Sequence, residues 1–326
     1  MKALLCKSYG PPESLVIEEV ESPLPAAGQV VVSVKACGIN FPDALIIENK
    51  YQFKPPLPFS PGGEVAGVIT KLGPNVEGWS VGDEVIAYVL WGGLAQEIAV
   101  DVGNLMAKPP GMPFEEAAAF LLAYGTVLHA LQDRGVLKSG ETLLVLGAAG
   151  GVGTAAIQIG KGVGARVIAA TSSPEKNAVC RQLGADECID YSSGDIKEQL
   201  RALTNGAGVD VVFDPVGGTL ADPVVRSTAW KGRYLVIGFA SGDIPKIPLN
   251  LVLLKGISLV GVFWGSFFDR EPENRSAHMN ALRDLYERGI VRPHVSAVYP
   301  FSRAGEAISD LRDRRATGKI VVRVME

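Results

Sequence analysis

A glycine-rich turn near the middle of the chain has the residue types and spacing needed to bind phosphate. The apolar run 142–146 predicts a strand, 154–161 predicts a helix packed on a sheet, and the glycines lie between them. Gly150 lets backbone amides approach a pyrophosphate, Gly153 lets the helix pack closely on the strand, and the helix N-terminus faces the anion. The spacing alone is a weak signal, because Ala148 replaces the usual first glycine, and an ordinary turn stays an alternative. In this context we expect a nucleotide-binding loop.

The end of the next predicted strand, 166–171, bears on the choice of nucleotide. This strand follows the helix at the distance that a βαβ unit requires. A site that prefers NAD usually has an acid here, which binds the ribose 2′-hydroxyl and repels a 2′-phosphate. The chain instead has Ser172 and Ser173, with Lys176 one helical turn later, so the pattern favours NADP. The serines also suit the cap of a helix that Pro174 opens, and the two roles are compatible.

Length and composition are those of an ordinary globular protein. The chain has 326 residues, of which 47% are hydrophobic and 20% charged, which is enough for two domains with separate cores. The net charge of −4 and the isoelectric point near 5.6 argue against a nucleic-acid footprint and against a membrane-binding patch. The apolar region 249–268 is interrupted by Lys255 and three glycines, so we interpret it as strands and turns.

The cysteines and the first residues of the chain indicate in which cellular compartment the protein is expected. Four cysteines lie far apart, with no Cys-x-x-Cys pair and no nearby histidine, which suits thiols in a reducing compartment. The apolar run at residues 3–6 is too short for a signal-peptide core. We therefore expect a cytoplasmic protein.

The pattern of elements changes along the chain. Up to about residue 113 short β-rich runs separated by Pro and Gly turns, at 29–35, 64–70 and 83–88, predict a small barrel-like β domain. Two helices are expected at 113–122 and 126–132. Strands and helices then alternate through 209–214 and 232–238, which predicts a doubly wound parallel sheet. Helices are expected at 277–288 and 304–314, and a last strand at 319–324. That strand has to pair somewhere, and we expect it to return to the N-terminal β domain.

With these motifs in place, the chain resembles the zinc-independent quinone oxidoreductases, the zeta-crystallin-like branch of the medium-chain dehydrogenase/reductase superfamily. The resemblance covers nearly the whole length and rests on six motifs, at 36–43, 51–67, 81–85, 147–153, 183–186 and 318–319. Two further runs, 236–242 and 261–265, are similar to the quinone-oxidoreductase-like subgroup.

This resemblance implies an α/β protein with two domains. A GroES-like, β-rich catalytic domain would comprise 1–123 and 266–326, and a Rossmann domain that binds NADP would comprise 124–265. The resemblance also implies a homodimer in which edge strands of the two nucleotide domains pair.

The resemblance further implies which residues hold the cofactor, NADPH. The residues at the pyrophosphate would be Ala149, Gly150, Gly151 and Val152, and those around the adenosine ribose and its phosphate Ser172, Lys176 and Tyr191. The nicotinamide side would be lined by Gly238, Phe239, Ala240, Phe263, Trp264 and Gly265, with Thr126 bonding the nicotinamide amide and Asn40 and Tyr51 reaching in from the catalytic domain. For Phe263 and Trp264, plain core packing is the alternative.

Zinc ligands are missing from the positions where related alcohol dehydrogenases carry them. Asn40 stands where those proteins have a cysteine, and Gly63 where they have a histidine. The segment 88–100 contains no cysteine for a structural zinc lobe, so too few ligands remain for a tetrahedral site. We interpret His129 and His294 as core or surface residues and expect no metal.

The absence of zinc ligands narrows the expected chemistry. Reduction of an isolated carbonyl puts a full charge on one oxygen, which generally calls for a Lewis acid or a proton donor. A quinone or an enone spreads that charge, so hydrogen bonds from the Asn40 amide and the Tyr51 hydroxyl would suffice. We expect a small-molecule quinone as the acceptor, with an enone, an enal or an enoyl thioester as alternatives. A NADPH-binding protein with a structural or RNA-binding role is the alternative outside enzymes.

Overall fold

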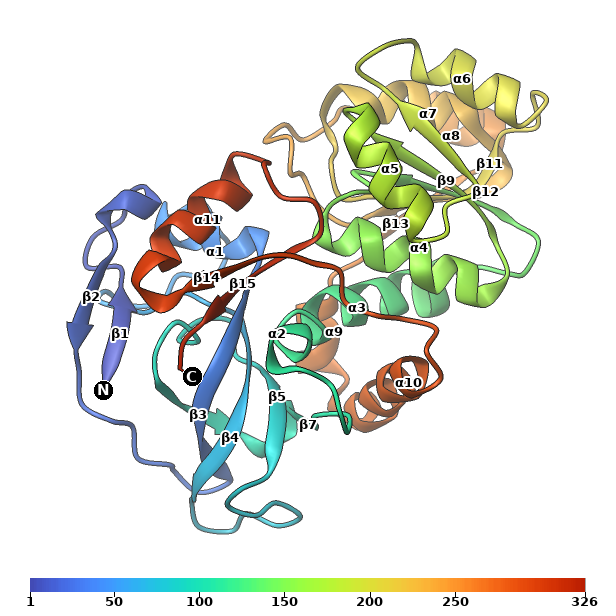
Figure 1. Cartoon of the computed structure of the whole chain (residues 1–326). Helices are drawn as coiled ribbons and strands as arrows, with labels where there is room; N and C mark the ends of the chain where they lie inside the picture. Colours follow the sequence, from blue (N-terminus) through green and yellow to red (C-terminus); the bar gives the residue numbers. More distant parts are fainter. Residues whose placement is uncertain (326) are drawn as a thin grey trace. The chain divides into compact units, whose positions relative to one another are not determined.

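The computed structural model describes residues 1–325, which fold into two compact units. The first, here called the β unit, consists of Met1–Leu122, Arg275–Arg283 and Pro293–Glu326. The second, the α/β unit, consists of Ala123–Asn274 and Asp284–Arg292. Each unit is built on a sheet of its own (Figure 1).

A seven-stranded sheet forms the centre of the β unit. Its order is β14-β15-β3-β4-β5-β7, and β6 pairs with β3 beside this path. The strands are β3 (Gln29–Ile39), β4 (Glu64–Leu72), β5 (Glu84–Tyr88), β6 (Glu97–Asp101), β7 (Leu105–Ala107), β14 (Val295–Pro300) and β15 (Lys319–Arg323), and a separate hairpin pairs β1 (Lys2–Leu5) with β2 (Val16–Glu19). The three predicted β runs thus lie in β3, β4 and β5.

Helices and a continuous core complete the β unit. Its helices are α1 (Phe41–Ile47), α2 (Phe114–Ala117) and α11 (Ala304–Arg312). Val30, Val32 and Val34 of β3 pack with Ile320 and Val322 of β15, and all five are buried. Because β3 is covered on both faces, its sequence is nearly continuously apolar and does not alternate.

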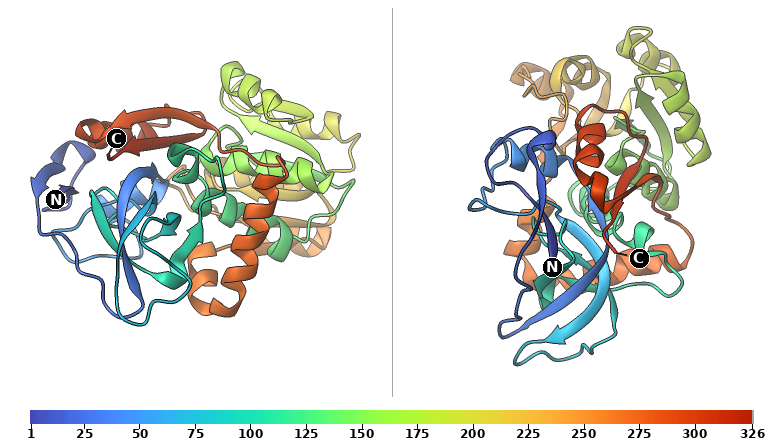
Figure 2. Two further views of the ribbon diagram at one scale, coloured as in Figure 1. Left: turned by 60° about the horizontal axis from the view of Figure 1, so that its bottom comes forward. Right: turned by 60° about the vertical axis from the view of Figure 1, so that its left-hand side comes forward.

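The C-terminal strand β15 returns to the N-terminal half of the chain, as predicted. It pairs antiparallel with β3, with Ile320 opposite Ile39 and Val322 opposite Cys37, and β14 pairs parallel to its other edge. In Figure 2 the red end of the chain lies beside the blue strand β3. This register places the first residue of β15, Lys319, next to the end of β3.

A six-stranded parallel sheet forms the centre of the α/β unit. Its order is β10-β9-β8-β11-β12-β13, the arrangement of a doubly wound nucleotide-binding fold. The strands are β8 (Thr142–Leu146), β9 (Arg166–Thr171), β10 (Glu187–Asp190), β11 (Val209–Asp214), β12 (Thr228–Val236) and β13 (Ser258–Gly261). The predicted parallel sheet is confirmed.

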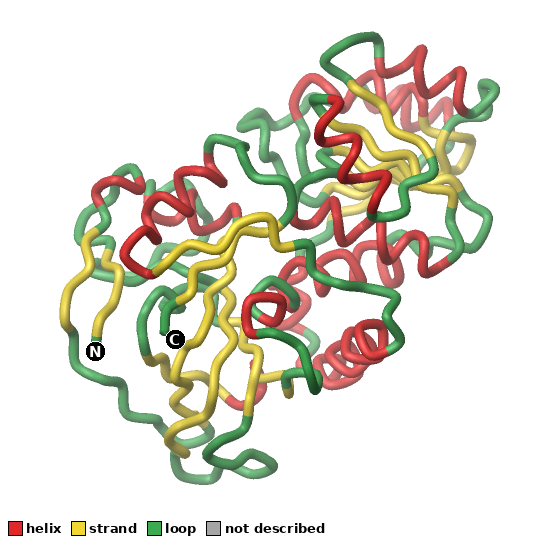
Figure 3. Tube along the Cα trace, in the orientation of Figure 1, coloured by secondary structure: helices red, strands yellow, loops and turns green. Residues whose placement is uncertain are grey.

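Helices flank both faces of this sheet (Figure 3). They are α4 (Gly151–Val163), α5 (Pro174–Gln182), α6 (Ile196–Leu203), α7 (Ala221–Ser227) and α8 (Leu249–Lys255), whereas α9 (Trp264–Arg270) packs against α3 through Trp264 and Gly125. The helices α3 (Leu121–Leu128) and α10 (Arg275–Glu287) each have residues in both units. Short 3-10 turns lie at Pro12–Ser14, Val102–Asn104, Gly218–Leu220, Pro272–Asn274 and Phe301–Arg303. Within residues 1–325 no helix is both long and apolar enough to cross a membrane.

Two sequence expectations about helices were wrong in detail. The region 249–268 was expected to hold strands and turns, but it contains α8 and α9 on either side of β13. Its apolar segments are too short for periodicity to separate helix from strand. The expected helix 126–132 begins earlier, as α3, and continues as a π-helix over His129–Arg134.

Candidate functional site

The glycine-rich turn between β8 and α4 has the geometry of a phosphate cradle. Gly147 has a φ of +57°, which L side chains rarely adopt, and its carbonyl accepts a hydrogen bond from the Gly150 N–H at 2.9 Å. A Cβ at Gly153 would lie 2.4 Å from the Gly147 oxygen, so only glycine fits there. The close packing predicted for Gly153 is therefore present.

The N-terminus of α4 lies at one end of this turn. Gly150 caps the helix without a side chain, and its first turn contains no acid. The first amides of a helix lack intrahelical acceptors and carry partial positive charge. Gly151 and Val152 supply such amides, and Ala149 precedes them in the turn. These residues fit a pyrophosphate.

Three of the residues expected around the adenosine ribose lie close together at the ends of β9 and β10. Thr171, the buried last residue of β9, accepts the Tyr191 N–H at its carbonyl at 3.0 Å. The Ser173 side chain accepts from the Lys176 N–H and caps α5. The Lys176 ammonium donates to the Ser172 hydroxyl at 3.3 Å. A cation and two hydroxyls thus occupy the place where NAD-binding sites carry an acid.

The turn that follows β11 is held by the side chain of Asp214. The sequence analysis did not identify this residue. This buried carboxylate accepts the N–H groups of Val216 and Gly217 at 2.7 and 2.9 Å, and its other oxygen accepts the Tyr234 hydroxyl. Burial and the Asp214 charge raise the pKa of Tyr234. An acid that directly follows the apolar run 211–213 at the end of a strand is the signal that could have identified this group.

The segment 238–240 is held against this turn by backbone hydrogen bonds. The Gly238 N–H donates to the Asp214 carbonyl at 3.4 Å, and the Ala240 N–H donates to the Pro215 carbonyl at 3.0 Å. Phe239 is exposed between them. The segment that follows β12, which contains three of the six residues expected to line the nicotinamide side, is therefore held at the end of β11.

The segment 263–265 divides between surface and core. Phe263 is exposed, whereas Trp264 is buried, and its ring lies 4.5 Å from that of Phe268. A Cβ at Gly125 would come within 2.8 Å of the indole. The structure thus gives Trp264 the packing role that the sequence left open. Thr126, next to Gly125 on α3, is partly exposed.

In the β unit, Asn40 lies at the start of α1 with its amide bonded within the chain. The side-chain nitrogen donates to the Gly38 carbonyl at 3.2 Å and to Glu64 Oε2 at 3.3 Å. The side-chain oxygen accepts from the ammonium of Lys319. Both donor bonds are at the long end of the normal range.

Lys319 and Glu64 form a buried ion pair beside this amide. The ammonium lies 3.3 Å from Glu64 Oε2 and 3.3 Å from the Ile39 carbonyl, and the two side chains are 3% and 0% exposed. Glu64 Oε1 accepts the Leu122 N–H at 2.9 Å. The sequence showed Lys319 only as part of a motif and did not indicate this contact.

Asp43 and Tyr51 complete the polar residues of this region. The buried Asp43 carboxylate accepts the N–H groups of Asn40 and Gly62 at 2.7 and 2.9 Å. Burial raises the pKa of Asp43 to about 6, although these donors lower it. Burial and the Asp43 charge also raise the pKa of Tyr51, so its hydroxyl is protonated at neutral pH. The Tyr51 and Phe53 rings lie 5.8 Å apart.

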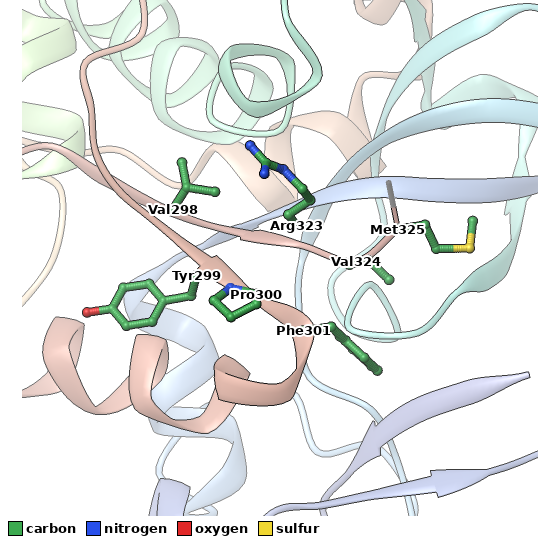
Figure 4. A pocket seen from close by; sticks show the side chains of 7 residues that line it. All are labelled: Val298, Tyr299, Pro300, Phe301, Arg323, Val324 and Met325. Atoms are coloured by element: carbon green, nitrogen blue, oxygen red, sulfur yellow. The ribbon is translucent and has the colours of Figure 1, made fainter.

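The β unit also has a hollow of about 520 Å³. It is lined by seven residues of β14, β15 and the segments that follow them: Val298, Tyr299, Pro300, Phe301, Arg323, Val324 and Met325 (Figure 4). Arg323 pairs with Glu115 at 2.7 Å. No residue expected in the site lines this hollow, and we assign it no role.

Comparison with known proteins agrees with both units. Residues 26–112 match the family described as alcohol dehydrogenase GroES-like domain, and residues 151–280 match the family described as zinc-binding dehydrogenase. Quinone oxidoreductase-like protein 2 of Rattus norvegicus is 37% identical over 98% of this chain and 91% of its own length.

Solved structures extend this likeness. A quinone oxidoreductase of Pseudomonas syringae is 32% identical, with a TM-score of 0.92 over 98% of this chain and 99% of its own. A mycobacterial protein complexed with NADPH is 30% identical, with a TM-score of 0.92 over 99% of each chain. The chain therefore belongs to the zinc-independent, quinone oxidoreductase branch of the medium-chain dehydrogenase/reductase superfamily. It is an oxidoreductase of that superfamily.

The donor groups present do not fit the zinc ion that one family description mentions. The Asn40 amide is bonded to Lys319 and Glu64, and the Lys319 ammonium would repel a cation at this place. Gly63 has no side chain, and a Cβ there would meet the Leu90 carbonyl at 3.2 Å. Over residues 1–325 no group of three or more His, Cys, Asp or Glu side chains is arranged to hold a metal ion.

We expect the purified protein to contain no stoichiometric zinc, because a buried ammonium lies where a cation would need anionic ligands. Elemental analysis of dialysed protein, with and without added zinc, measures this directly. Chelator treatment should leave activity and unfolding temperature unchanged. One tightly held zinc per chain would contradict the prediction.

Proposed function

We propose that this protein is a NADPH-dependent oxidoreductase that transfers a hydride to a conjugated acceptor, most directly a quinone. The observation that carries the proposal is the phosphate cradle at Gly150 together with the Ser172–Lys176 contact at the neighbouring strand end. NADPH, when bound, supplies the hydride. The mycobacterial structure with NADPH and the quinone oxidoreductase of Pseudomonas syringae support it.

Each part of the α/β unit has a task in this proposal. The amides of Gly150, Gly151 and Val152, which follow Ala149, hold the pyrophosphate. Ser172, Lys176 and Tyr191 surround the adenosine ribose and its phosphate. The residues proposed for the nicotinamide side are Thr126, Gly238, Phe239, Ala240, Phe263 and Gly265, with Trp264 supporting them from the core. Asp214 keeps the 238–240 segment in place through the turn that it caps.

The preference for NADPH follows from charge. Lys176 offers an ammonium and Ser172 a hydroxyl, both of which suit a 2′-phosphate. An acid at the same place would repel that phosphate. NADH lacks the phosphate and gains little from either group.

Replacing Lys176 by Ala should weaken NADPH binding about ten- to a hundred-fold, because it removes a charge-assisted contact worth about 1.5–3 kcal/mol. NADH binding should change little. Fluorescence titration of both cofactors measures the two dissociation constants. Lys197→Ala, at an exposed lysine of α6, is the matched control. Equal affinity of the unmodified protein for NADPH and NADH would refute the preference.

The acceptor is proposed to bind through Asn40 and Tyr51. Tyr51 has a protonated hydroxyl that can donate to an oxygen of the acceptor. The Asn40 amide donates through two long bonds, for which an acceptor oxygen can compete. A conjugated acceptor spreads the incoming charge, so such hydrogen bonds can stabilise the transition state without a Lewis acid.

The unmodified protein should oxidise NADPH with quinones or enones and scarcely at all with saturated aldehydes or ketones. Asn40→Ala and Tyr51→Phe should each lower kcat/KM about ten- to a thousand-fold, the range for loss of one positioned donor. A panel of quinones, enones, enals and enoyl thioesters, followed by NADPH absorbance, measures both effects and ranks the acceptors. Tyr9→Phe, at an exposed tyrosine, is the control. Good turnover of saturated ketones, or full activity of a variant that combines Asn40→Ala with Tyr51→Phe, would show that the acceptor site lies elsewhere.

We also propose a homodimer formed through the β13 edge of the α/β unit. Exposed apolar side chains gather beside this edge on β12, α8 and the loop before α8: Trp230, Ile244, Leu249, Leu253 and Leu254. The Trp230 ring lies against Gly256 at the end of α8, and α8 packs against β12. Large exposed apolar patches mark interaction sites, and an unpaired edge strand can pair with a second copy.

The double variant Leu253→Asp/Leu254→Asp should convert a dimer into a monomer. These side chains are 79% and 69% exposed, so folding should tolerate the charges while an apolar interface would not. Light scattering after size exclusion gives the mass. Leu24→Asp, at a leucine in the β unit that is 82% exposed, should leave the dimer intact. A monomeric unmodified protein at micromolar concentration would rule the dimer out.

The cysteines support a reducing compartment. All four are free thiols, and Cys6, Cys37 and Cys180 are buried. Burial raises the pKa of Cys180 to about 12, which makes it unreactive. We propose a cytoplasmic enzyme on this basis.

A further inference from the structure

The ion pair between Lys319 and Glu64 has no part in the function proposed so far. Both side chains are almost completely buried, and their charged atoms lie 3.3 Å apart. Burying two charges costs several kcal/mol per ion, and an apolar pair of similar size is often as stable. A gain in folding stability therefore does not account for this ion pair. The hydrogen bonds that its two side chains make indicate a second role.

The pair fixes the orientation of the Asn40 amide. An ammonium only donates hydrogen bonds, and a carboxylate only accepts them. Asn40 Oδ1 accepts from Lys319, and its nitrogen donates to Glu64 Oε2. If the amide turned over, its nitrogen would face the ammonium and its oxygen the carboxylate. The pair thus leaves the amide one orientation, with its nitrogen toward Gly38 and Glu64.

The same carboxylate also anchors the start of α3. Glu64 Oε1 accepts the Leu122 N–H at 2.9 Å, which is one of the amides that the first turn of a helix leaves without a partner. A negative charge at this end is favourable for the helix dipole. Thr126 follows four residues later on α3. Lys319 therefore touches a network that includes both Asn40 and the helix that carries Thr126.

We propose that Lys319 is a positioning residue: anchored by Glu64, its ammonium holds the Asn40 amide in one orientation, so that an acceptor oxygen meets its N–H groups by competing for the long bonds to Gly38 and Glu64. The inference rests on the proposed function, in which Asn40 contacts the acceptor. It differs from a purely compensating role, in which Lys319 only neutralises the buried Glu64 charge. The two roles predict different outcomes when both charges are removed together.

The test compares Lys319→Met, Glu64→Gln and the double variant Lys319→Met/Glu64→Gln. Each single variant leaves a buried charge unpaired and should unfold at a lower temperature than the unmodified protein. The double variant leaves no unpaired charge and should recover most of that loss. Its kcat should stay about a hundred-fold low, because the ammonium that held Asn40 Oδ1 is gone. The KM for NADPH should stay within about two-fold, because the residues proposed to hold the pyrophosphate and the ribose phosphate belong to the α/β unit.

A second ion pair on the same strand provides the control. Arg323 of β15 pairs with Glu115 at 2.7 Å but is 54% exposed. Arg323→Met should leave both kcat and the unfolding temperature close to those of the unmodified protein.

Recovery of kcat in the double variant to within about three-fold would show charge compensation only and would overturn the proposal. A normal kcat in Lys319→Met would do the same. If a single variant does not fold, the double variant carries the test, since neither of its side chains is charged.

A readout without turnover separates this proposal from the proposed function. If the unmodified protein oxidises NADPH with none of the acceptors, the proposed function fails, and NMR of the Asn40 side-chain amide then decides the positioning role. Its two N–H signals, assigned by their loss in Asn40→Asp, should be resolved and slow to exchange in the unmodified protein. They should shift and exchange rapidly in the double variant. Unchanged signals would overturn the positioning role.

Discussion

The antiparallel pairing of β15 with β3 is the constraint on which the candidate acceptor region depends. It brings residues from the two ends of the chain into register, with Ile320 opposite Ile39. Lys319 therefore lies beside Asn40, although 279 positions separate the two residues. Without this pairing the Glu64 charge would be buried alone, which is strongly unfavourable. The strand β15, which lies between β14 and β3 in the sheet, thus also supplies the ammonium that contacts Asn40 and Glu64.

The α/β unit reaches its arrangement through a different rule. In a parallel sheet all strands end at the same edge, and ligands bind outside those ends. The turn at Gly147–Gly153 follows β8, the Ser172–Lys176 contact follows β9, and the Asp214 turn follows β11. A pair of glycines shapes the turn after β8, a helix cap shapes the turn after β9, and a buried carboxylate shapes the turn after β11. The shared edge then combines them into one candidate surface for a long, anionic ligand.

Chemistry in the β unit follows from what surrounds the Lys319 ammonium. Its contacts are all to atoms of the chain, at Ile39, Asn40 and Glu64. An ammonium engaged in this way orders its neighbours but offers no open coordination position to a carbonyl, in contrast to a catalytic zinc. In the proposed reaction, stabilisation of developing charge therefore falls to neutral donors, the Tyr51 hydroxyl and the Asn40 amide. That arrangement suits acceptors that delocalise charge.

The sequence by itself determined the parts that depend on neighbouring residues. The glycine turn, the parallel strands and the helix cap at Ser173 were all predictable, because strand runs, glycine spacing and capping are local properties. The return of the last strand was predictable too, since an apolar strand must pair. Tertiary structure alone decided that Trp264 is buried against Gly125 and that Lys319 bonds Asn40. The physical reason is that burial and ion pairing depend on which segments, far apart in the sequence, pack together in the fold. The pattern of neighbouring residues does not indicate which distant segment a side chain will contact.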